Sequence, residues 1–337
     1  MRREGPVIPV SASSATRSNR LQGKVAIITM TSTIDPEAFR PYVWSDRVAF
    51  ISGGASGIGF GLAQALAARG VRIALSDVRQ DALAEASEVL RRDGAEVLAV
   101  PGDVADRHSM RAVADTVEQH FGKVHYVFNN AGVGDLGTPL YEEADENFDW
   151  MVDVNLRGVF NAIKAFVPKL RMHGERGHIV NTSSMAGLVT EAGWNQGTYS
   201  ATKRAVIGLS LDLRASLQGS NVGVSVLCPG LVRTDIEANA ATLRPSPKAP
   251  IALPALLAAA SMPARVAGEI VLRRMEHGDF YIITHPELWP RVESEQEEVR
   301  QAFDASAQWL ADMLHHLSAP AAAGASMAAT SQRSNSS

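Results

Sequence analysis

The sequence predicts an α/β fold, a doubly wound parallel sheet with helices on both faces. Two observations predict it. From Arg47 onward, short runs rich in Val, Ile and Ala alternate with segments whose apolar residues recur at helical spacing. The strand-like runs also lack the polar–apolar alternation of a half-exposed sheet, so we expect both faces to be buried. The crossovers between such strands are expected to be right-handed.

Each expected element follows from the local pattern. Several helical segments end at a glycine, such as Gly70 and Gly94, which is a typical helix stop. The expected strands cover 48–52, 71–77, 95–103, 124–132, 177–184, 221–230 and 279–284, and the expected helices cover 60–70, 81–94, 109–122, 145–174 and 199–217.

Composition is that of an ordinary globular protein, with 337 residues, 46% hydrophobic content and a net charge of −4. We expect a single domain over 45–317, an N-terminal extension over 1–44 that is largely disordered, and a disordered Ala/Ser-rich tail over 318–337. The charge and patterning argue against nucleic acid or membrane as partners. The single cysteine, Cys228, excludes an intrachain disulfide and a Cys-rich metal site, and a cytoplasmic location fits it.

The extension contains a partial copy of a later segment. LQGKVAIITM (21–30) parallels WSDRVAFISG (44–53), but Met30 stands where the second segment has a glycine. This first copy is therefore not expected to hold phosphate. Chance, an added edge strand and a retained insertion all remain open as its origin.

Glycines at the end of the strand 48–52 indicate a dinucleotide site. Gly53, Gly57 and Gly59 lie between this strand and a helix, where a tight turn lets backbone approach a pyrophosphate at the helix N-terminus. Asp77 ends the next strand about 20 residues on, as a ribose-binding carboxylate does. A carboxylate there favours NAD over NADP, whereas Arg79, two residues further, is able to pair with a phosphate and keeps NADP open.

A catalytic group is indicated by YSATK, which places Tyr199 and Lys203 four residues apart on one helix face. An ammonium and a nicotinamide charge would lower the pKa of the tyrosine from its usual value near 10 and make it a usable base. Ser184, at a strand end, is suited to hydrogen-bond a substrate oxygen, and Asn155 is suited to hold a backbone carbonyl and a water.

Taken together, these motifs resemble the short-chain dehydrogenase/reductase family. The matches occur in the family's order: SGGASGIG (52–59), GDV (102–104), NNAG (129–132), VNLRG (154–158), NTSS (181–184), YSATK (199–203) and CPGLVRTD (228–235). The resemblance implies a Rossmann-like fold and no metal. It implies the catalytic residues Asn155, Ser184, Tyr199 and Lys203, and Ser184 is preferred to its neighbour Ser183.

The same resemblance implies the cofactor contacts. They are Gly53, Ser56, Gly57, Ile58, Gly59, Asp77, Asp103, Val104, Asn130, Ala131, Gly132, Tyr199, Lys203, Pro229, Gly230, Val232 and Thr234. The expected reaction is hydride transfer between a secondary alcohol or ketone and the nicotinamide, with Tyr199 as acid and base. Relatives are often dimers or tetramers, so the resemblance implies a homo-oligomer through the helices that carry Asn155 and Tyr199.

The substrate is indicated less directly. Residues 236–265 are rich in Ala, Leu and Pro and are expected to form an apolar lid without clear secondary structure, which favours a bulky apolar or aromatic substrate. The segment 278–303 is similar to a bacterial branch of the family that includes lignin aryl-ether Cα-dehydrogenases. Alternatives are an NADPH-dependent carbonyl reductase and a non-catalytic nucleotide-binding protein, the latter disfavoured by the intact set of four catalytic residues.

Overall fold

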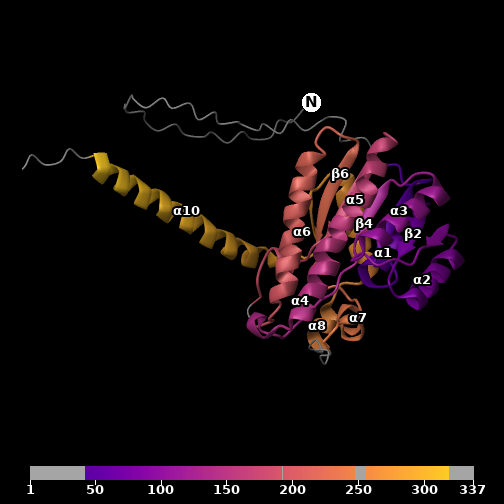
Figure 1. Ribbon diagram of the computed structural model, residues 1–337, viewed down its shortest axis with the longest axis horizontal. Coiled ribbons are helices and arrows are strands. Elements are labelled where there is room, and N and C mark those ends of the chain that lie inside the picture. The colour runs from indigo at the N-terminus through magenta and orange to yellow at the C-terminus, as the bar shows by residue number, and fades with distance from the viewer. Residues whose placement is uncertain (1–41, 192, 247–254, 319–337) are drawn as a thin grey trace, which may run out of the picture. The chain divides into compact units, whose positions relative to one another are not determined.

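A seven-stranded parallel sheet forms the centre of the computed structural model, which describes residues 42–191, 193–246 and 255–318 (Figure 1). The strands lie in the order β3-β2-β1-β4-β5-β6-β7, so the winding direction reverses between β1 and β4. Ligands of doubly wound folds bind at the carboxyl end of such a reversal. The strands are β1 (Val48–Ser52), β2 (Arg72–Ser76), β3 (Val97–Ala99), β4 (Tyr126–Asn129), β5 (Gly177–Thr182), β6 (Val222–Cys228) and β7 (Tyr281–Ile283).

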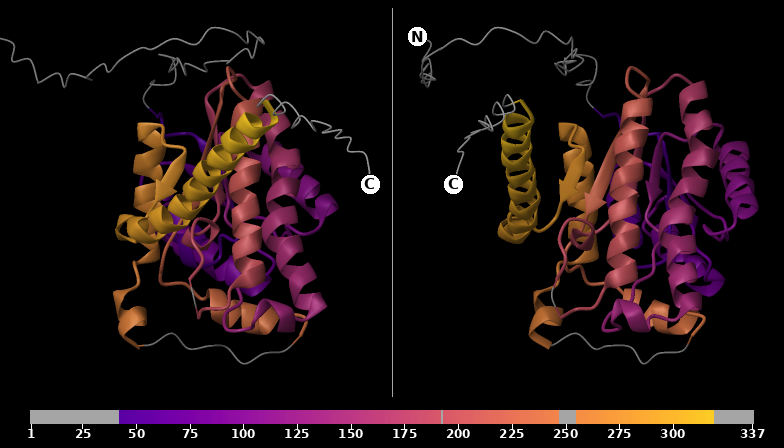
Figure 2. Two further views of the ribbon diagram at one scale, coloured as in Figure 1. Left: turned by 90° about the vertical axis from the view of Figure 1, so that its left-hand side faces the viewer. Right: turned by 60° about the vertical axis from the view of Figure 1, so that its left-hand side comes forward.

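Helices cover both faces of the sheet. In β1, Phe50 packs into one core and its neighbour Ile51 into the other, because successive strand residues point to opposite faces. One face carries α1 (Gly57–Ala67), α2 (Gln80–Arg92) and α9 (Ala264–His277). The other carries α3 (Arg107–Phe121), α5 (Gly158–Met172) and α6 (Gly197–Ser216), of which α5 and α6 run side by side in Figure 2.

The predicted fold class is confirmed, and each predicted strand and helix is found. The long helix predicted over 145–174 is subdivided into α4 (Asp145–Val152), a π-helical turn (Asp153–Arg157) and α5. The first helix begins at Gly57, inside the glycine motif, rather than at residue 60. Among the helices described, none is long and apolar enough to cross a membrane.

The segment predicted as a lid without clear structure does contain helices. It carries α7 (Ile236–Leu243) and α8 (Ala255–Ala260), and residues 247–254 lie outside the described part. Val232, just before this segment, pairs in an isolated bridge with Met262, near the end of the segment. Figure 1 shows α4, α7 and α8 at the same end of the sheet.

The folded unit begins slightly before residue 45. Tyr42 and Trp44 stack with ring centroids 5.2 Å apart, and Trp44 Nε1 donates to Glu276 at 2.7 Å. Both rings pack against the core on the α1 side. The partial copy at 21–30 and the tail 319–337 lie outside the described residues, so the predictions made for them stay predictions.

After β7, a short 3₁₀ turn (Pro286–Leu288) leads into α10 (Trp289–Ser318). Val292, in the first turns of α10, is buried in the core that also holds Met185 and Val206. Glu295 pairs with Arg204 of α6 at 2.9 Å. The first turns of α10 therefore pack against the same core as the segment that follows β5.

Candidate active site

The glycine turn follows β1 and opens α1. Gly53 and Gly57 have φ of +61° and +53°, a region that favours glycine. A Cβ on Gly53 would lie 2.7 Å from Ala131 Cα, and one on Gly59 would lie 2.2 Å from the Gly53 oxygen. Only bare backbone fits at these two positions. Ser56 is the residue before α1, and Ile58 lies in its first turn.

The loops after β1 and β4 are tied together beside this turn. The Ser52 hydroxyl accepts hydrogen bonds from the backbone of Asn130 at 3.1 Å and of Ala131 at 3.2 Å. The Asn130 amide donates to the oxygens of Ser52 and Gly53. These bonds fix the strand ends on either side of the point where the winding reverses.

Asp77 follows β2 and is almost fully buried. Its carboxylate accepts from the backbone of Ala55 at 3.2 Å and from the Arg79 backbone at 3.1 Å. The Arg79 side chain also pairs with it, with Nε 3.1 Å from Oδ1. Both residues that bear on cofactor preference thus lie against each other at one end of the glycine turn.

Two further predicted cofactor residues follow β3. Val104 is buried, and a Cβ on Gly158 would lie 2.7 Å from its Cγ2. Its backbone oxygen accepts from the Asn161 amide of α5 at 2.9 Å. Asp103 is exposed and its carboxylate accepts from the Ala105 backbone at 2.9 Å.

The segment after β6 lies on the other side of the candidate site from the loop after β3. The Pro229 oxygen accepts from the Met185 backbone at 2.9 Å, and Val232 is buried. Gly230 lies against His285, because a Cβ there would be 2.6 Å from the imidazole. Thr234 reaches the glycine turn, since a Cβ on Gly57 would lie 2.9 Å from its methyl group.

Asn155 lies in the π-helical turn between α4 and α5, a local widening that is frequent at functional sites. Its side chain accepts from the Val133 backbone at 2.8 Å and donates to the Val133 oxygen at 2.9 Å. A second donor contact runs to the Thr202 hydroxyl at 3.2 Å. Asn155 thus fixes the loop after β4 and connects it to α6.

Lys203 is buried one turn after Tyr199 on α6. Its Nζ donates to the Thr182 oxygen at 3.0 Å and lies 5.6 Å from the centroid of the Tyr199 ring. A Cβ on Gly132 would lie 3.1 Å from this Nζ and 3.2 Å from Asn155 Oδ1. Gly132 therefore marks the point where Lys203 and Asn155 converge.

Ser184 and its neighbour Ser183 have different partners. Ser183 is buried and its hydroxyl donates to the Lys203 backbone oxygen at 2.7 Å. The Ser184 hydroxyl accepts from the Ala186 backbone at 3.1 Å and hydrogen-bonds the Tyr199 side chain. Of the two serines, Ser184 is the one whose hydrogen bond lowers the pKa of Tyr199.

Burial has the largest influence on the pKa values of Tyr199 and Lys203. Burial raises the pKa of Tyr199 above its usual value, the Ser184 hydrogen bond lowers it, and the negative charge of Glu237 raises it. Burial lowers the pKa of Lys203 to about 8. The lowered tyrosine pKa expected from the sequence is therefore not produced by the chain's own groups, because desolvation outweighs the hydrogen bond.

Sequence reasoning missed the polar residues of α7. Asn239 accepts from Arg79 Nη1 at 2.7 Å, and Arg244 forms a buried ion pair with Asp135 at 3.1 Å. Glu237 acts on Tyr199, as described above. No local signal distinguishes these side chains in an Ala-rich segment, because their partners lie far away in the chain, 160 positions for Asn239 and 109 for Arg244.

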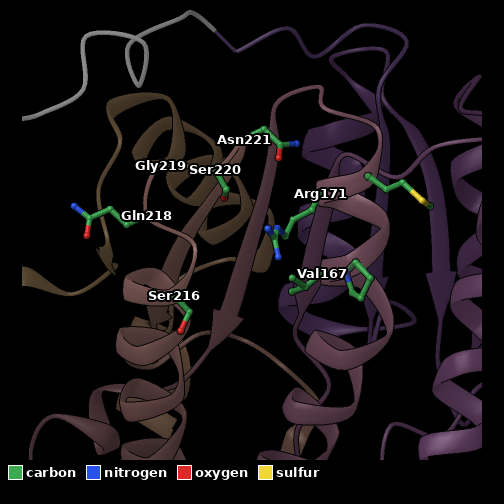
Figure 3. A pocket seen from close by; sticks show the side chains of 9 residues that line it. Val167, Arg171, Ser216, Gln218, Gly219, Ser220 and Asn221 are labelled. Atoms are coloured by element: carbon green, nitrogen blue, oxygen red, sulfur yellow. The ribbon is translucent and has the colours of Figure 1, made fainter.

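A separate cleft of about 650 Å³ opens between the C-terminal end of α5 and the segment that joins α6 to β6 (Figure 3). Arg171, Ser216 and Asn221 are among its lining residues. Asn221 immediately precedes β6, so this cleft lies at the amino end of the strands. The residues described above lie at the carboxyl end, and we assign the cleft no part in their chemistry.

Comparison with known proteins identifies the family. The family model described as short chain dehydrogenase matches residues 47–244, more than half of the chain. The chain therefore belongs to the short-chain dehydrogenase family, and it is an oxidoreductase of the short-chain alcohol dehydrogenase/reductase type.

Individual relatives agree with this. The chain is 33% identical over 291 residues to a C alpha-dehydrogenase of a Sphingobium strain, covering 79% of this chain and 94% of that one. It is 41% identical over 187 residues to a 1-deoxy-11-beta-hydroxypentalenate dehydrogenase of Streptomyces avermitilis, covering 55% and 68%. A short-chain dehydrogenase/reductase from Burkholderia phymatum, solved in complex with NAD, is similar with a TM-score of 0.72 and 34% identity, covering 77% and 96%.

Proposed function

We propose that this chain catalyses NAD-linked oxidation of a secondary alcohol, or the reverse reduction of a ketone, at the carboxyl end of the sheet. The observation that carries the proposal is the convergence of four side chains beside the glycine turn. Asn155 and Lys203 meet at Gly132, and Tyr199 meets Ser184 through a hydrogen bond.

The residues present fit a dinucleotide. The backbone at Gly53 and Gly59 leaves no room for side chains, and the N-terminus of α1 adds a partial positive charge that favours a pyrophosphate. Gly53, Ser56, Gly57, Ile58 and Gly59 would hold the phosphates, Asp77 the adenosine ribose, and the segment 229–234 the nicotinamide end. The bound nicotinamide would supply the hydride acceptor or donor.

In the proposed mechanism, Tyr199 removes the hydroxyl proton of the substrate and returns it in the reverse direction. Ser184 hydrogen-bonds the reacting oxygen and holds it in reach of the tyrosine. Lys203, as an ammonium, stabilises the phenolate electrostatically. Asn155 holds the loop at Val133 and positions a water through which the proton leaves the site.

NAD is the proposed cofactor because Asp77 is a buried carboxylate, able to accept from ribose hydroxyls and repelling a 2′-phosphate. The Arg79 side chain lies on the same carboxylate and also donates to Ser56 Oγ at 3.0 Å. This contact favours a second candidate, NADPH-linked carbonyl reduction, because a guanidinium at the ribose end is able to bind a phosphate.

A bulky or aromatic secondary alcohol is the proposed substrate. Support comes from the near full-length similarity to a C alpha-dehydrogenase. We also propose a homo-oligomer through α5 and α6, which leave Phe160 and Leu211 exposed.

The proposal is tested by incubating the purified chain with NAD, and separately with NADP, and a panel of benzylic, aliphatic, terpenoid and steroid secondary alcohols while reduced cofactor is measured. We expect turnover of aryl-substituted alcohols with NAD. Turnover with NADP alone would favour the second candidate, and absence of turnover together with absence of cofactor binding would contradict the proposed function.

A further inference from the structure

The C-terminal helix α10, drawn in yellow in Figure 1, contacts the rest of the molecule through its first turns. Val292 is buried in the core, and Glu295 pairs with Arg204 of α6. Over residues 299–317, every side chain whose burial is described is exposed, except that of Met313, which is half-buried. The greater part of this helix is therefore in contact with solvent in a single copy of the chain.

The exposed part carries an apolar stripe, which we call the α10 seam. Its members recur at alternating intervals of four and three residues and are Val299, Phe303, Ser306, Leu310, Met313 and Leu317. Trp309 and Leu314 flank the seam, and the exposed large apolar side chains on and beside it are 46–75% exposed. Alternating intervals of four and three residues are the heptad pattern by which one helix packs against another. The spacing therefore favours a second helix as the partner of the seam.

The charge of α10 argues against a lipid surface or a nucleic acid as that partner. The helix contains six Asp and Glu residues but only two Arg. Both arginines are paired, Arg291 with Glu191 and Arg300 with Glu297. A helix that lies on a membrane is rich in Lys and Arg on its polar face, and anionic lipids repel carboxylates. A protein surface is therefore the expected partner.

The α10 seam is complementary to itself when two copies lie antiparallel. Placing Phe303 of one copy opposite Ser306 of the other brings a large side chain against a small one, which lets facing layers interdigitate. The same register brings Leu310 opposite Val299, because both pairs are centred on the same point of the helix. The Ser306 hydroxyl donates to the Ala302 oxygen at 2.8 Å, so it needs no acceptor across the contact. Such self-complementarity is what a two-fold interface requires.

The charges along α10 also favour the antiparallel orientation over the parallel one. Four glutamates lie near its start, at 293, 295, 297 and 298. A parallel pair would place them against the same four residues of the second copy, and like charges repel. In the antiparallel register they lie opposite residues 311–316, where Asp312 is the only acidic residue. Antiparallel pairing therefore separates the acidic ends of the two helices.

The size of the surface fits a dimer contact. The apolar side chains on and beside the seam expose on the order of 500 Å², so two copies bring together roughly 1,000 Å², about the area that a specific interface needs. A cleft of about 530 Å³ also opens beside the first turns of α10, with Val189 and Val299 in its lining. In the antiparallel register this cleft lies at the level of residues 310–317 of the second copy, which include Leu314 and Leu317.

We propose that α10 is a self-association helix, whose seam packs antiparallel against the seam of a second copy of this chain. This contact is separate from the surface of α5 and α6 proposed above for a homo-oligomer, so one assembly is able to use both. The inference does not rest on the proposed catalytic function, because it uses only the residues of α10 and the cleft beside its first turns.

Sedimentation equilibrium of the full chain tests the surface. The double variant Phe303→Glu/Leu310→Glu adds two charges to the seam, and Ala305→Glu/Gln308→Glu adds two charges to the opposite face of the same helix as a matched control. We expect the seam variant to halve the assembled mass, with a dissociation constant raised about 100-fold or more, because paired apolar surface would have to bury charge. The control is expected to keep the mass of the unaltered chain.

Cysteine cross-linking tests the register, since the native Cys228 is buried. Val299→Cys and Leu310→Cys chains are expressed separately and also together with two different tags, and each preparation is oxidised. We expect a disulfide-linked dimer of the two variants when they are expressed together. Two copies of position 299 would lie roughly 16 Å apart along the antiparallel helices. Because a disulfide spans at most about 7 Å between Cα atoms, each variant alone should stay uncross-linked.

Three results would overturn the inference. The first is an unaltered chain that stays monomeric, or a seam variant whose mass equals that of the unaltered chain. The second is cross-linking of each variant alone, which indicates a parallel pair, or the absence of cross-linking in the co-expressed variants. The third is binding of the unaltered chain to vesicles of anionic phospholipid that the seam variant loses without a change in mass, which would assign the seam to a lipid surface.

Discussion

The two ends of the sheet carry similar residues in different arrangements. At the amino end, the Tyr42 hydroxyl lies 2.7 Å from His178 Nδ1, and His178 Nε2 lies 2.9 Å from Ser225 Oγ. Ser225 in turn donates to the Asp279 oxygen at 2.6 Å. Because the serine gives its proton to that carbonyl, His178 Nε2 donates to Ser225 and Nδ1 accepts from Tyr42. Each group in this chain is satisfied by protein.

At the carboxyl end, the tyrosine is also partly buried and hydrogen-bonded, but its surroundings differ. Tyr199 meets Ser184, two residues after the end of β5, and the N-terminus of α1 lies at the same end of the sheet. Parallel crossovers bring helix N-termini to this end and C-termini to the other, so only this end favours anions. Perturbed ionisation occurs at both ends, since burial raises the pKa of Tyr42 and of Tyr199 alike. A shifted pKa therefore does not distinguish the two ends, whereas the glycine turn occurs beside Tyr199 and supports the proposed site there.

The largest expected effect comes from a substitution in the glycine turn at the carboxyl end of the sheet. Gly53→Ala places a Cβ 2.7 Å from Ala131 Cα at a φ of +61°, so we expect at least tenfold weaker NAD binding and a loss of about 2–4 kcal/mol in the free energy of unfolding. Gly94→Ala is the matched control, because its φ is +87° but nothing lies within 4 Å. Gly94→Ala is expected to lose about 1–2 kcal/mol in the free energy of unfolding and to keep its affinity for NAD. Calorimetric titration and urea unfolding measure both quantities, and equal NAD affinities in the two variants would contradict the assigned role of Gly53.

At the amino end of the sheet, we expect His178 to make the stability of the protein depend on pH. Burial lowers the pKa of His178 from 6.5 to about 3, so below pH 6.5 the unfolded chain binds a proton that the folded chain does not. Stability is therefore complete above pH 6.5 and falls as pH decreases toward 3. Between pH 7 and pH 5 the loss attributable to this histidine is about 2 kcal/mol. Urea unfolding at the two pH values measures it, and the loss should shrink in His178→Gln; an equal loss in that variant would assign the effect elsewhere.

The sequence was sufficient to predict the fold, and it named most of the residues that the structure brings together at the carboxyl end of the sheet, because the relevant patterns are local. The strand–glycine–helix sequence around Gly53, the spacing of Tyr199 and Lys203, and the apolar runs of each strand need no distant partner to be recognised. The π-helical turn at Asn155 was not foreseen, since one extra residue per turn leaves no mark on a helical pattern.

Long-range contacts were not predictable. Tyr42 meets His178 across 136 positions, and Arg79 meets Asn239 across 160. The direction in which Glu237 points depends on where α7 lies over Gly134, which the Ala-rich sequence of the lid does not specify. The predicted apolar character of that segment is correct for its composition, but the segment also carries the polar residues Glu237, Asn239 and Arg244.

The most direct test of the account compares two tyrosines. Tyr199→Phe and Tyr42→Phe each remove one hydroxyl from a partly buried, hydrogen-bonded ring, one at each end of the sheet. Formation of reduced NAD from an aryl secondary alcohol is measured per mole of folded protein. We predict that Tyr199→Phe lowers kcat about 100- to 10,000-fold, as expected for loss of a general acid–base group, whereas Tyr42→Phe leaves kcat unchanged and lowers stability only. Full activity in Tyr199→Phe, or equal losses in both variants, would contradict the assignment of the chemistry to the carboxyl end.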